Sequence, residues 1–314
     1  MRIIAVANQK GGVGKTTTVV NLGAALASRG RRVAVLDLDP QAHLTASLGV
    51  DPRETTLSSY ELLTASEPLE AALRQVRSNL WLLPANLNLA AAEQELVAVV
   101  GRETLLRHAL DAAGSRWDYV LIDCPPSLGL LTLNALSAAL ELFIPLQPHF
   151  LSLQGLSQLL ESVLLVHRRI NPRLSVSGLL FCLYDGRTSL SAEIVSDVEA
   201  FFARQRSSAV PWRGVRLFAV RIRGNVKLAE CPSHGKTIHE YAPGSHGAQD
   251  YQALADEVEA MAGGAGPAAS ASDAASGAAP APQVVAEPPI CEPTITEPSA
   301  CPAVGQPAGQ VDHP

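Results

Sequence analysis

The sequence lacks the features that mark exported, membrane-spanning and metal-cluster proteins. No apolar run reaches the roughly 18 residues of a membrane span, and the first residues do not have the architecture of a signal peptide. The five cysteines are scattered, without the paired spacing of a zinc site or of a disulfide framework. We therefore expect a cytoplasmic protein that does not enter a membrane.

Lysine and arginine are absent from residues 262–314, which hold five acidic residues. Of the formal net charge of −6, this tail accounts for −5 and leaves −1 for residues 1–261. An almost neutral body does not argue against a nucleic-acid partner. The tail is rich in Ala, Pro, Gly and Ser, so burial of apolar side chains cannot offset the chain entropy there. We expect an ordered domain over 1–261 and a disordered tail over 262–314.

Short apolar runs alternate with longer helical patterns over the first 261 residues. This alternation is typical of a doubly wound α/β fold, with helices on both faces of a mostly parallel sheet. Helices are expected around 19–26, around 156–164 and over 250–261. The seven expected strands are 3–7, 33–36, 80–83, 119–122, 142–145, 177–183 and 217–220.

A loop rich in glycine and lysine, NQKGGVGKTT over residues 8–17, directly follows the first expected strand. Small residues let consecutive backbone N–H groups surround a phosphate, and the N-terminus of the next helix adds its positive end. Lys15 is expected to bind the β- and γ-phosphates, and the Thr16 hydroxyl to bind Mg²⁺. A glycine-rich turn with solvated lysines is the plainer alternative. The predicted nucleotide-binding residues of the loop are Lys10, Gly11, Gly12, Val13, Gly14, Lys15, Thr16 and Thr17.

The loop departs from the ordinary Walker A pattern, because Gln9 stands where that pattern has its first glycine. A second lysine at the start of the loop fits the deviant form of the motif instead. Three further segments follow in order: VLDLDPQ over 35–41, YVLIDCPPSLG over 119–129 and NVKLAECPSHGK over 225–236. On these four segments the chain resembles, over about residues 1–260, the ParA/MinD family of deviant Walker ATPases. Within that family it is most similar to the ParA (Soj-like) partition proteins, which implies a P-loop NTPase fold and ATP with Mg²⁺ as cofactors.

Acidic residues close two of the expected strands, where a doubly wound sheet places its ligands. Asp123 ends an apolar strand and is expected to hold Mg²⁺ through water. Asp37 and Asp39 alternate around Leu38, so a strand that continues through them would turn both side chains to the same side. The resemblance implies that Asp39 orients the attacking water and that Asp37 supports the metal; turn residues that cap the following segment are the alternative. The predicted metal residues are Thr16, Asp37 and Asp123, and the predicted catalytic residues are Lys10, Lys15 and Asp39.

Lys10 lies too early in the loop for the sequence alone to assign it to its own nucleotide. In the family, this lysine crosses a face-to-face dimer to the partner's phosphates, where positive charge assists phosphoryl transfer. The resemblance therefore implies a homodimer that forms on ATP binding. Gly11 and Gly12 are then small because two backbones meet there.

Cations are concentrated between residues 203 and 239, where eight lysines and arginines accompany a single acid, Glu230. Such clustering is expected for contacts to the nucleic-acid backbone, which do not depend on base sequence. A solvated charged face is the alternative. The resemblance favours nonspecific DNA and implies the DNA-binding residues Arg187, Arg221, Arg223, Lys227 and Lys236.

One segment departs from the family pattern. Residues 222–225, Ile-Arg-Gly-Asn, lack the rigid proline that family members carry there, so only Asn225 is assigned to the base of the nucleotide. The resemblance implies a nucleoid-associated ATPase that partitions chromosome or plasmid DNA with a ParB-like stimulating protein. The alternatives are a MinD-like or cellulose-synthesis-associated positioning ATPase and a nucleotide-gated scaffold with little turnover. No motif identifies the cargo or the role of the tail.

Overall fold

A single sheet of nine strands organises the part of the chain that the computed structural model describes, residues 1–149 and 151–263. Its order is β3-β4-β2-β5-β1-β6-β7-β8, and β9 pairs with β7. Every pair is parallel except β3 with β4. The predicted tail lies outside the described residues from 264 onward, so the tail and its boundary stay predictions. The strands are β1 (Arg2–Val6), β2 (Val33–Asp37), β3 (Arg74–Arg77), β4 (Leu80–Leu83), β5 (Tyr119–Asp123), β6 (Glu141–Leu146), β7 (Ser175–Tyr184), β8 (Arg216–Leu217) and β9 (Ile222–Arg223).

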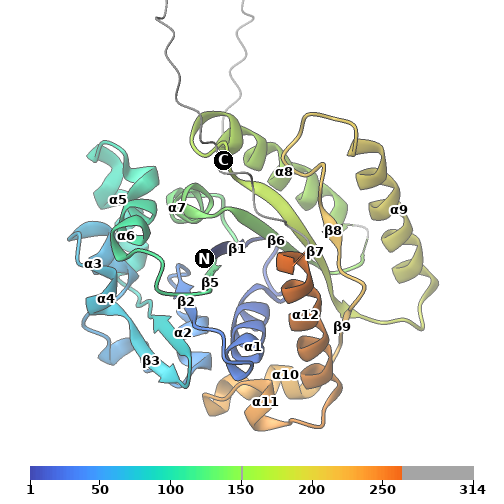
Figure 1. Ribbon diagram of the computed structural model, residues 1–314, viewed down its shortest axis with the longest axis horizontal. Helices are drawn as coiled ribbons and strands as arrows, with labels where there is room; N and C mark the ends of the chain where they lie inside the picture. The colour runs from blue at the N-terminus through green and yellow to red at the C-terminus, as the bar shows by residue number, and fades with distance from the viewer. Residues whose placement is uncertain (150, 264–314) are drawn as a thin grey trace, which may run out of the picture. The chain divides into compact units, whose positions relative to one another are not determined.

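The doubly wound α/β class is confirmed, because helices cover both faces of this mostly parallel sheet (Figure 1). On one face the apolar core is built from α1, α2, α11 and α12, and on the other from α3 to α9. None of the helices in the described residues combines the length and apolarity that crossing a bilayer requires. The helices are α1 (Lys15–Ser28), α2 (His43–Ser47), α3 (Ser59–Thr64), α4 (Leu69–Ala72), α5 (Leu89–Glu95), α6 (Leu105–Ala113), α7 (Leu130–Ala138), α8 (Leu151–Arg169), α9 (Ser189–Gln205), α10 (Val226–Glu230), α11 (Ile238–Tyr241) and α12 (His246–Gly263), with short 3₁₀ turns at Pro52–Glu54, Leu96–Ala98, Arg102–Thr104 and Cys231–His234.

The strand predictions are confirmed for the six mostly buried runs, and they fail at the two ends of the strand order. The expected strand over 217–220 is shorter and earlier, since β8 holds only Arg216–Leu217. Two strands were not predicted. β3 has the polar sequence RQVR and pairs antiparallel with β4 as the outermost strand. β9 has only two residues, so neither strand shows an apolar run.

The three predicted helices are all present, and each is longer than its apolar pattern. The helix expected around 19–26 is α1, which starts at Lys15 because Gly14 adopts a left-handed conformation with φ 96° and ends the phosphate loop. Val19, Leu22 and Leu26 of α1 are fully buried against the sheet. The helices expected around 156–164 and over 250–261 are α8 and α12.

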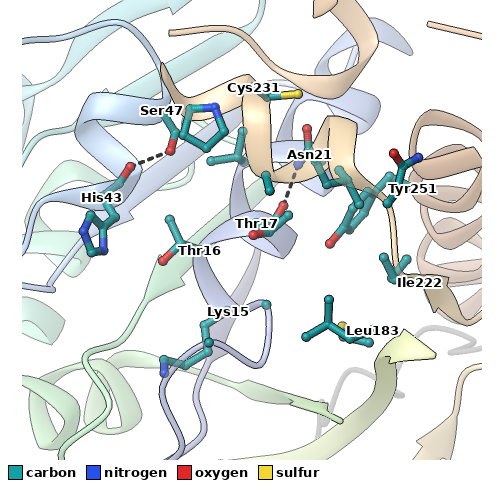
Figure 2. A pocket seen from close by; sticks show the side chains of 18 of the residues that line it. Lys15, Thr16, Thr17, Asn21, His43, Ser47, Leu183, Ile222, Cys231 and Tyr251 are labelled. Atoms are coloured by element: carbon teal, nitrogen blue, oxygen red, sulfur yellow. Dashed lines mark hydrogen bonds between the residues drawn. The ribbon is translucent and has the colours of Figure 1, made fainter. Parts of the chain in front are cut away.

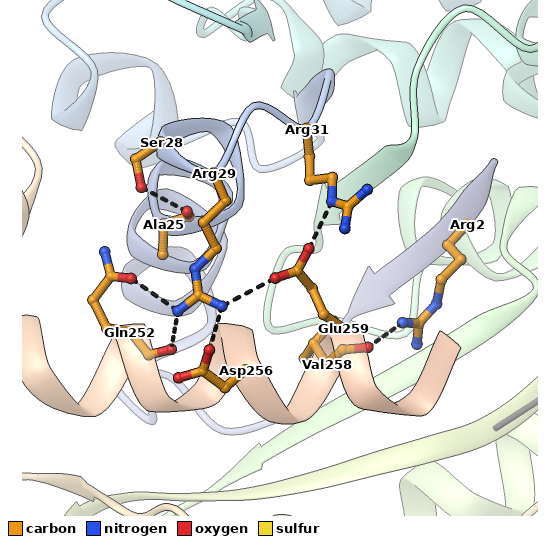
Figure 3. Close-up of polar contacts among 9 residues, drawn as sticks. All are labelled: Arg2, Ala25, Ser28, Arg29, Arg31, Gln252, Asp256, Val258 and Glu259. Atoms are coloured by element: carbon orange, nitrogen blue, oxygen red, sulfur yellow. Dashed lines mark hydrogen bonds and ion pairs between the residues drawn. The ribbon is translucent and has the colours of Figure 1, made fainter. Parts of the chain in front are cut away.

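The last helix, α12, is fixed to α1 and β1 by a polar network (Figure 3). The Arg29 guanidinium donates to Asp256 Oδ1 at 2.6 Å and to Glu259 Oε2 at 3.0 Å. Arg2 donates to the Val258 carbonyl at 2.6 Å, which ties the end of α12 to the start of β1. The C-terminal part of the domain therefore belongs to the same packed layer as the phosphate-loop helix.

The strand register brings the three motif-bearing strands to one level. Asp123 pairs with Val6 on one side and with Asp37 on the other, so β1, β5 and β2 end together. We call this border, where the parallel strands end, the carboxyl edge, and the opposite border the amino edge. Residues 8–17, Asp39 and Asp123 meet at the carboxyl edge, where doubly wound sheets bind their ligands.

Candidate nucleotide-binding site

The loop over residues 8–17 is shaped to surround an anion. Gly12 and Gly14 have φ values of 73° and 96°, in the left-handed region that favours glycine, while Val13 is buried and anchors the loop. Within the described residues, no backbone N–H from Gly11 to Thr17 donates to a protein acceptor; the first such bond is Thr18 N–H to the Gly14 carbonyl at 2.9 Å. These N–H groups and the N-terminus of α1 form a cradle for phosphate oxygens.

Lys15 is held inside this cradle. Its side chain is buried, and Nζ donates to the Lys10 carbonyl at 3.1 Å. Burial lowers the pKa of Lys15, and the nearby Asp123 carboxylate opposes this shift. A cation in this position lacks a carboxylate within bonding distance and is placed to bind a phosphate.

The Thr16 hydroxyl and Asp123 link the loop to β5 directly. Thr16 Oγ1 donates to Asp123 Oδ2 at 2.6 Å. The other oxygen, Oδ1, is buried and has no hydrogen-bond partner in the described residues. An orphaned carboxylate oxygen beside a hydroxyl fits Mg²⁺, which prefers oxygen ligands and usually keeps several waters and substrate phosphates. The described residues hold no group of three or more His, Cys, Asp or Glu that could bind a metal.

Burial raises the pKa of Asp123 well above its ordinary value, and the charge of Asp37 adds to this effect. A buried carboxylate in contact with another carboxylate is costly to ionise unless a cation joins it. The electrostatics therefore favour the arrival of a divalent cation at this place.

The structure separates the two acids of the DLD motif. β2 ends at Asp37, so the expected strand alternation through Asp39 does not occur. Asp37 is fully buried, with Oδ1 accepting from Asp39 N–H at 3.1 Å and Oδ2 from the Thr45 N–H and hydroxyl at 2.9 and 2.6 Å. Asp39 lines the cavity described below and accepts from Gln41 N–H at 2.9 Å. Asp37 thus positions the backbone of Asp39, and its place in the metal shell stays a prediction.

Lys10 is not among the residues that line the cavity beside the loop. Its ammonium group contacts Nε2 of His149, which follows β6. Burial lowers the pKa of His149, and the charge of Lys10 lowers it further. The sequence did not reveal this partner, because no motif connects the two segments.

A cavity of about 560 Å³ opens beside the loop, within the size range of nucleotide and cofactor sites (Figure 2). Thr17 and Asn21 of α1 form its floor, and Asn21 donates to the Thr17 carbonyl at 2.8 Å. Leu183, with the uncommon φ of 52°, borders the cavity at the end of β7. Leu228, Cys231 and Pro232 of this wall belong to the segment 225–236 singled out in the sequence. Sequence reasoning missed the others, because they are ordinary side chains that only the fold brings together: Asn21, His43, Ser47, Cys182, Leu183 and Tyr251.

Asn225, the residue assigned to the base, lines this cavity at the start of α10. Its side chain accepts from Lys227 N–H at 2.9 Å and so caps the helix, which leaves its amide NH₂ for other contacts. Its neighbour Arg223 is bound by Asp250, with Nη2 to Oδ1 at 2.5 Å, and also lines the cavity. The missing proline therefore coincides with an ion pair that fixes the segment.

The five predicted DNA-binding residues do not form one cluster of free cations. Arg187 pairs with Asp185 at 2.9 Å, and Lys227 pairs with Glu230 at 2.8 Å. Lys236 lines the cavity, as does Arg223. Arg221 stacks on the Tyr184 ring at 4.5 Å and donates to its hydroxyl at 2.6 Å. All five follow β7 or lie near the cavity, and their contact with DNA stays a prediction.

Comparison with known proteins identifies what this chain is similar to. The family described as "AAA domain" matches residues 1–176. The sporulation initiation inhibitor protein Soj of Bacillus subtilis is 43% identical over 260 residues, which cover 82% of this chain and 98% of Soj. The chromosome-partitioning protein ParA of Myxococcus xanthus is 43% identical over 258 residues, covering 82% of this chain and 87% of that protein.

Solved structures show the same fold with nucleotides bound. A crystal structure named cobyrinic acid a,c-diamide synthase, from Mycobacterium smegmatis with ADP and magnesium, superimposes with a TM-score of 0.71 at 39% identity, over 84% of this chain and 96% of that chain. The septum site-determining protein MinD of Pyrococcus horikoshii, with Mg-ADP, has a TM-score of 0.64 at 27% identity, over 83% and 97% of the two chains.

Proposed function

Because the chain belongs to the Soj/ParA family of chromosome-partitioning ATPases, we propose that ATP joins two copies of it into a dimer that binds DNA without sequence preference. The protein is an ATPase that uses ATP and Mg²⁺. The observation that supports its first step, the binding of Mg²⁺ and ATP, is the orphaned Asp123 oxygen beside Thr16, at a loop whose N–H groups have no protein acceptor among the described residues.

The proposed roles in hydrolysis follow from position. The N–H groups of residues 11–17 and the Lys15 ammonium bind the phosphates, and Thr16 with Asp123 holds Mg²⁺, which neutralises developing charge. Asp39 lines the cavity with one oxygen bound to Gln41 N–H, so the other is available to orient the attacking water. Asp37 keeps this loop in place through the Asp39 N–H.

The case for dimerisation rests on features that one subunit leaves unused. Gly11 has no left-handed φ, and a Cβ built on it meets no atom within 4 Å, so its own subunit does not require glycine there. The space above it suits a facing backbone. Lys10 precedes Gly11 in the chain and contacts His149 in the single subunit, and it can exchange that contact for the partner's phosphate.

The case for DNA binding rests on cations near the same opening. Arg187 is exposed for 90% of its side chain and Lys227 for 51%, so phosphates can displace their acidic neighbours without loss of buried structure. We further propose that a ParB-like protein stimulates hydrolysis, which separates the two subunits and ends the ATP-dependent contact with DNA, with the nucleoid as the place of action.

Dimerisation is tested by the mass of the Asp39→Ala variant in light scattering, because slow hydrolysis preserves the ATP state. We expect a doubled mass with Mg²⁺ and ATP and the monomer mass with ADP. Lys10→Ala in the same background is expected to remain monomeric while still binding ATP. An unchanged mass with saturating ATP would refute the dimer.

DNA binding is tested in the ATP state with Lys227→Glu, measured by anisotropy of a labelled duplex. We expect this variant to dimerise normally and to lose DNA affinity by about tenfold or more, since it removes one phosphate contact and adds repulsion. Wild-type affinity in Lys227→Glu would exclude this residue from the DNA surface.

A further inference from the structure

Six arginines without acidic partners lie at the amino edge of the sheet, on the face covered by α8 and α9. Segments 162–176 and 200–215 together contain these six arginines and not one Asp, Glu or Lys. All six are exposed, and none of their guanidinium groups has an ion pair or a hydrogen bond with another described residue; Arg173 donates only its backbone N–H, to the Asn171 side chain at 3.2 Å. We call this group the amino-edge patch: Arg168, Arg169, Arg173, Arg204, Arg206 and Arg213.

The fold brings these two distant segments together. α8 leads into β7 and α9 leads into β8, and both strands run parallel, so both helices end at the amino edge. The Val176 N–H donates to the Pro211 carbonyl at 2.9 Å, which holds the loop before β8 against the start of β7. A cavity of about 410 Å³ between them is lined by His167, Arg173 and Arg213.

Other arginines at the same edge behave differently. On the opposite face Arg29 is paired with Asp256, and Arg31 with Glu259 (Figure 3). Arg2 is paired with Glu141 at 2.7 Å, Arg32 with Asp118 at 3.2 Å, and Arg216 with Glu257 at 3.4 Å. The acidic residues at this edge therefore pair with arginines outside the patch, and the positive charges of the six patch arginines stay unpaired.

Neighbouring described elements do not supply an ion pair to the patch, although Asp197 of α9 lines a cavity of about 280 Å³ together with Arg204. On α6, Arg107 donates to the Ile170 carbonyl at 3.4 Å, and so adds a cation beside the turn after α8. Asp111, one turn further along α6, has no ion pair with any patch residue. The acids of α8 and α9 lie earlier in each helix, at Glu161 and at residues 193–199.

Helix dipoles explain only part of this arrangement. Cations in the last turn of a helix are stabilised by the partial negative charge there, which accounts for Arg168, Arg169 and Arg204. Arg173 and Arg213 lie beyond the helices, and both line the cavity. The hydroxyl oxygen of Ser177, a third lining residue, is buried without a hydrogen-bond partner among the described residues.

We propose that the amino-edge patch binds the backbone phosphates of nucleic acid, as a second surface that works without ATP. Arginine is suited to this ligand, since its planar fork can bond two phosphate oxygens at once. The six charges spread beyond the cavity, which fits an extended polyanion better than one small phosphate compound. Contacts of this kind carry no base specificity and depend strongly on salt.

The patch is separate from the nucleotide site. Arg173 precedes β7 and Arg187 follows it, and a strand of ten residues spans roughly 30 Å at about 3.3 Å per residue. A dimer that forms at the carboxyl edge leaves the amino edge exposed in both subunits. The inference therefore does not rest on dimerisation or on ATP binding.

The test is the affinity of the full chain for a short labelled duplex of random sequence, in buffer with a chelator and without nucleotide. Wild type is expected to bind with an affinity that falls linearly as log salt rises. Arg173→Glu with Arg213→Glu is expected to lower this affinity about tenfold or more and to reduce the salt slope by about 2, which corresponds to two lost phosphate contacts.

The control is Arg53→Glu with Arg74→Glu, which changes the net charge equally and is expected to bind within about twofold of wild type. Arg53 lies in the turn Pro52–Glu54, and Arg74 on β3, at the other end of the strand order from β8. Lys227→Glu is expected to keep nucleotide-free binding, so a failure of the proposed ATP-dependent surface is distinguishable from a failure of the patch. Melting temperatures check folding, and Arg168→Glu with Arg206→Glu replaces the first pair if that pair unfolds.

Three results would overturn the proposal. The first is that wild type does not bind DNA without nucleotide, and the second is that the patch variant and the control variant bind DNA equally well. The third is that the patch variant loses binding of a poly-glutamate peptide but keeps binding of DNA. The last result would identify an acidic protein segment as the ligand instead.

Discussion

The carboxyl edge and the amino-edge patch hold charges in opposite ways. At the carboxyl edge Lys15, Asp37 and Asp123 are each at most 7% exposed, and a named neighbour positions each of them. In the patch the arginines are exposed and have no acidic partner. A buried charge is tolerated only where its surroundings fix it, so an open bonding position there indicates a small ligand of defined geometry. An exposed, unpaired cluster indicates a large polyanion whose own geometry varies.

The largest expected effect tests whether chemistry is confined to the carboxyl edge. Asp39→Ala is expected to lower kcat for ATP hydrolysis by about 10²- to 10⁴-fold, because the water loses its orienting carboxylate. ATP binding, measured by fluorescence of a labelled analogue, is expected to change little. Asp185→Ala, which removes an exposed acid after β7, serves as the control and is expected to hydrolyse ATP normally. Normal turnover in Asp39→Ala would remove this residue from the mechanism.

A second, smaller effect compares a buried acid with an exposed one. Asp250 is mostly buried and accepts from both the N–H and the guanidinium of Arg223, whereas Asp185 pairs with Arg187 in solvent. Asp250→Ala is expected to lower the free energy of unfolding by about 2 kcal/mol, since it strands a buried N–H and a cation. Asp185→Ala is expected to cost about 0.5 kcal/mol or less. Urea titrations measure both, and equal losses would contradict the contrast.

The smallest expected effect concerns how the free energy of unfolding depends on pH through His239, on α11. Burial lowers the pKa of His239 below its ordinary value of 6.5, although its Nε2–H donates to the Asn21 carbonyl at 3.1 Å. The folded state therefore favours neutral histidine, and the stability that this contributes is complete above pH 6.5 and declines as the pH falls below it.

His239→Gln is expected to make unfolding less dependent on pH between 7.5 and 5.5 than it is in wild type, as measured by urea titration. His108→Gln changes an exposed histidine on α6 and is expected to keep the wild-type dependence. The same pH dependence in His239→Gln as in wild type would show that protonation elsewhere controls acid stability.

Some parts of this molecule are encoded locally and others are not. The phosphate loop, Asp39 and Asp123 are contiguous with the strands that place them, so apolar runs and loop composition were sufficient to predict the parallel core and the end of the sheet where these residues meet. The contact of Lys10 with His149 joins segments 139 residues apart, and no local pattern reveals it. The strand alternation expected through Asp37 and Asp39 does not occur, because β2 ends at Asp37, whose carboxylate accepts a hydrogen bond from the Thr45 N–H.

The basic run over 203–239 shows the same limit. In the sequence its eight cations form one cluster, but strand β8 and the turn after it divide them between the two edges of the sheet. Arg213 joins Arg173 at the amino edge, while Arg223 joins Asp250 at the cavity. A run of cations in the sequence therefore predicts an anionic partner. It does not predict how many surfaces of the folded chain contact that partner.

The most direct test of the central claim is a crystal structure of the full chain grown with Mg²⁺ and a slowly hydrolysed ATP analogue. The account predicts a triphosphate on the N–H groups of residues 11–17, Mg²⁺ beside Thr16 and Asp123, and a facing second copy whose Lys10 has left His149 for that phosphate. A loop without nucleotide at saturating analogue, or a bound nucleotide in an isolated subunit with Lys10 still on His149, would contradict it.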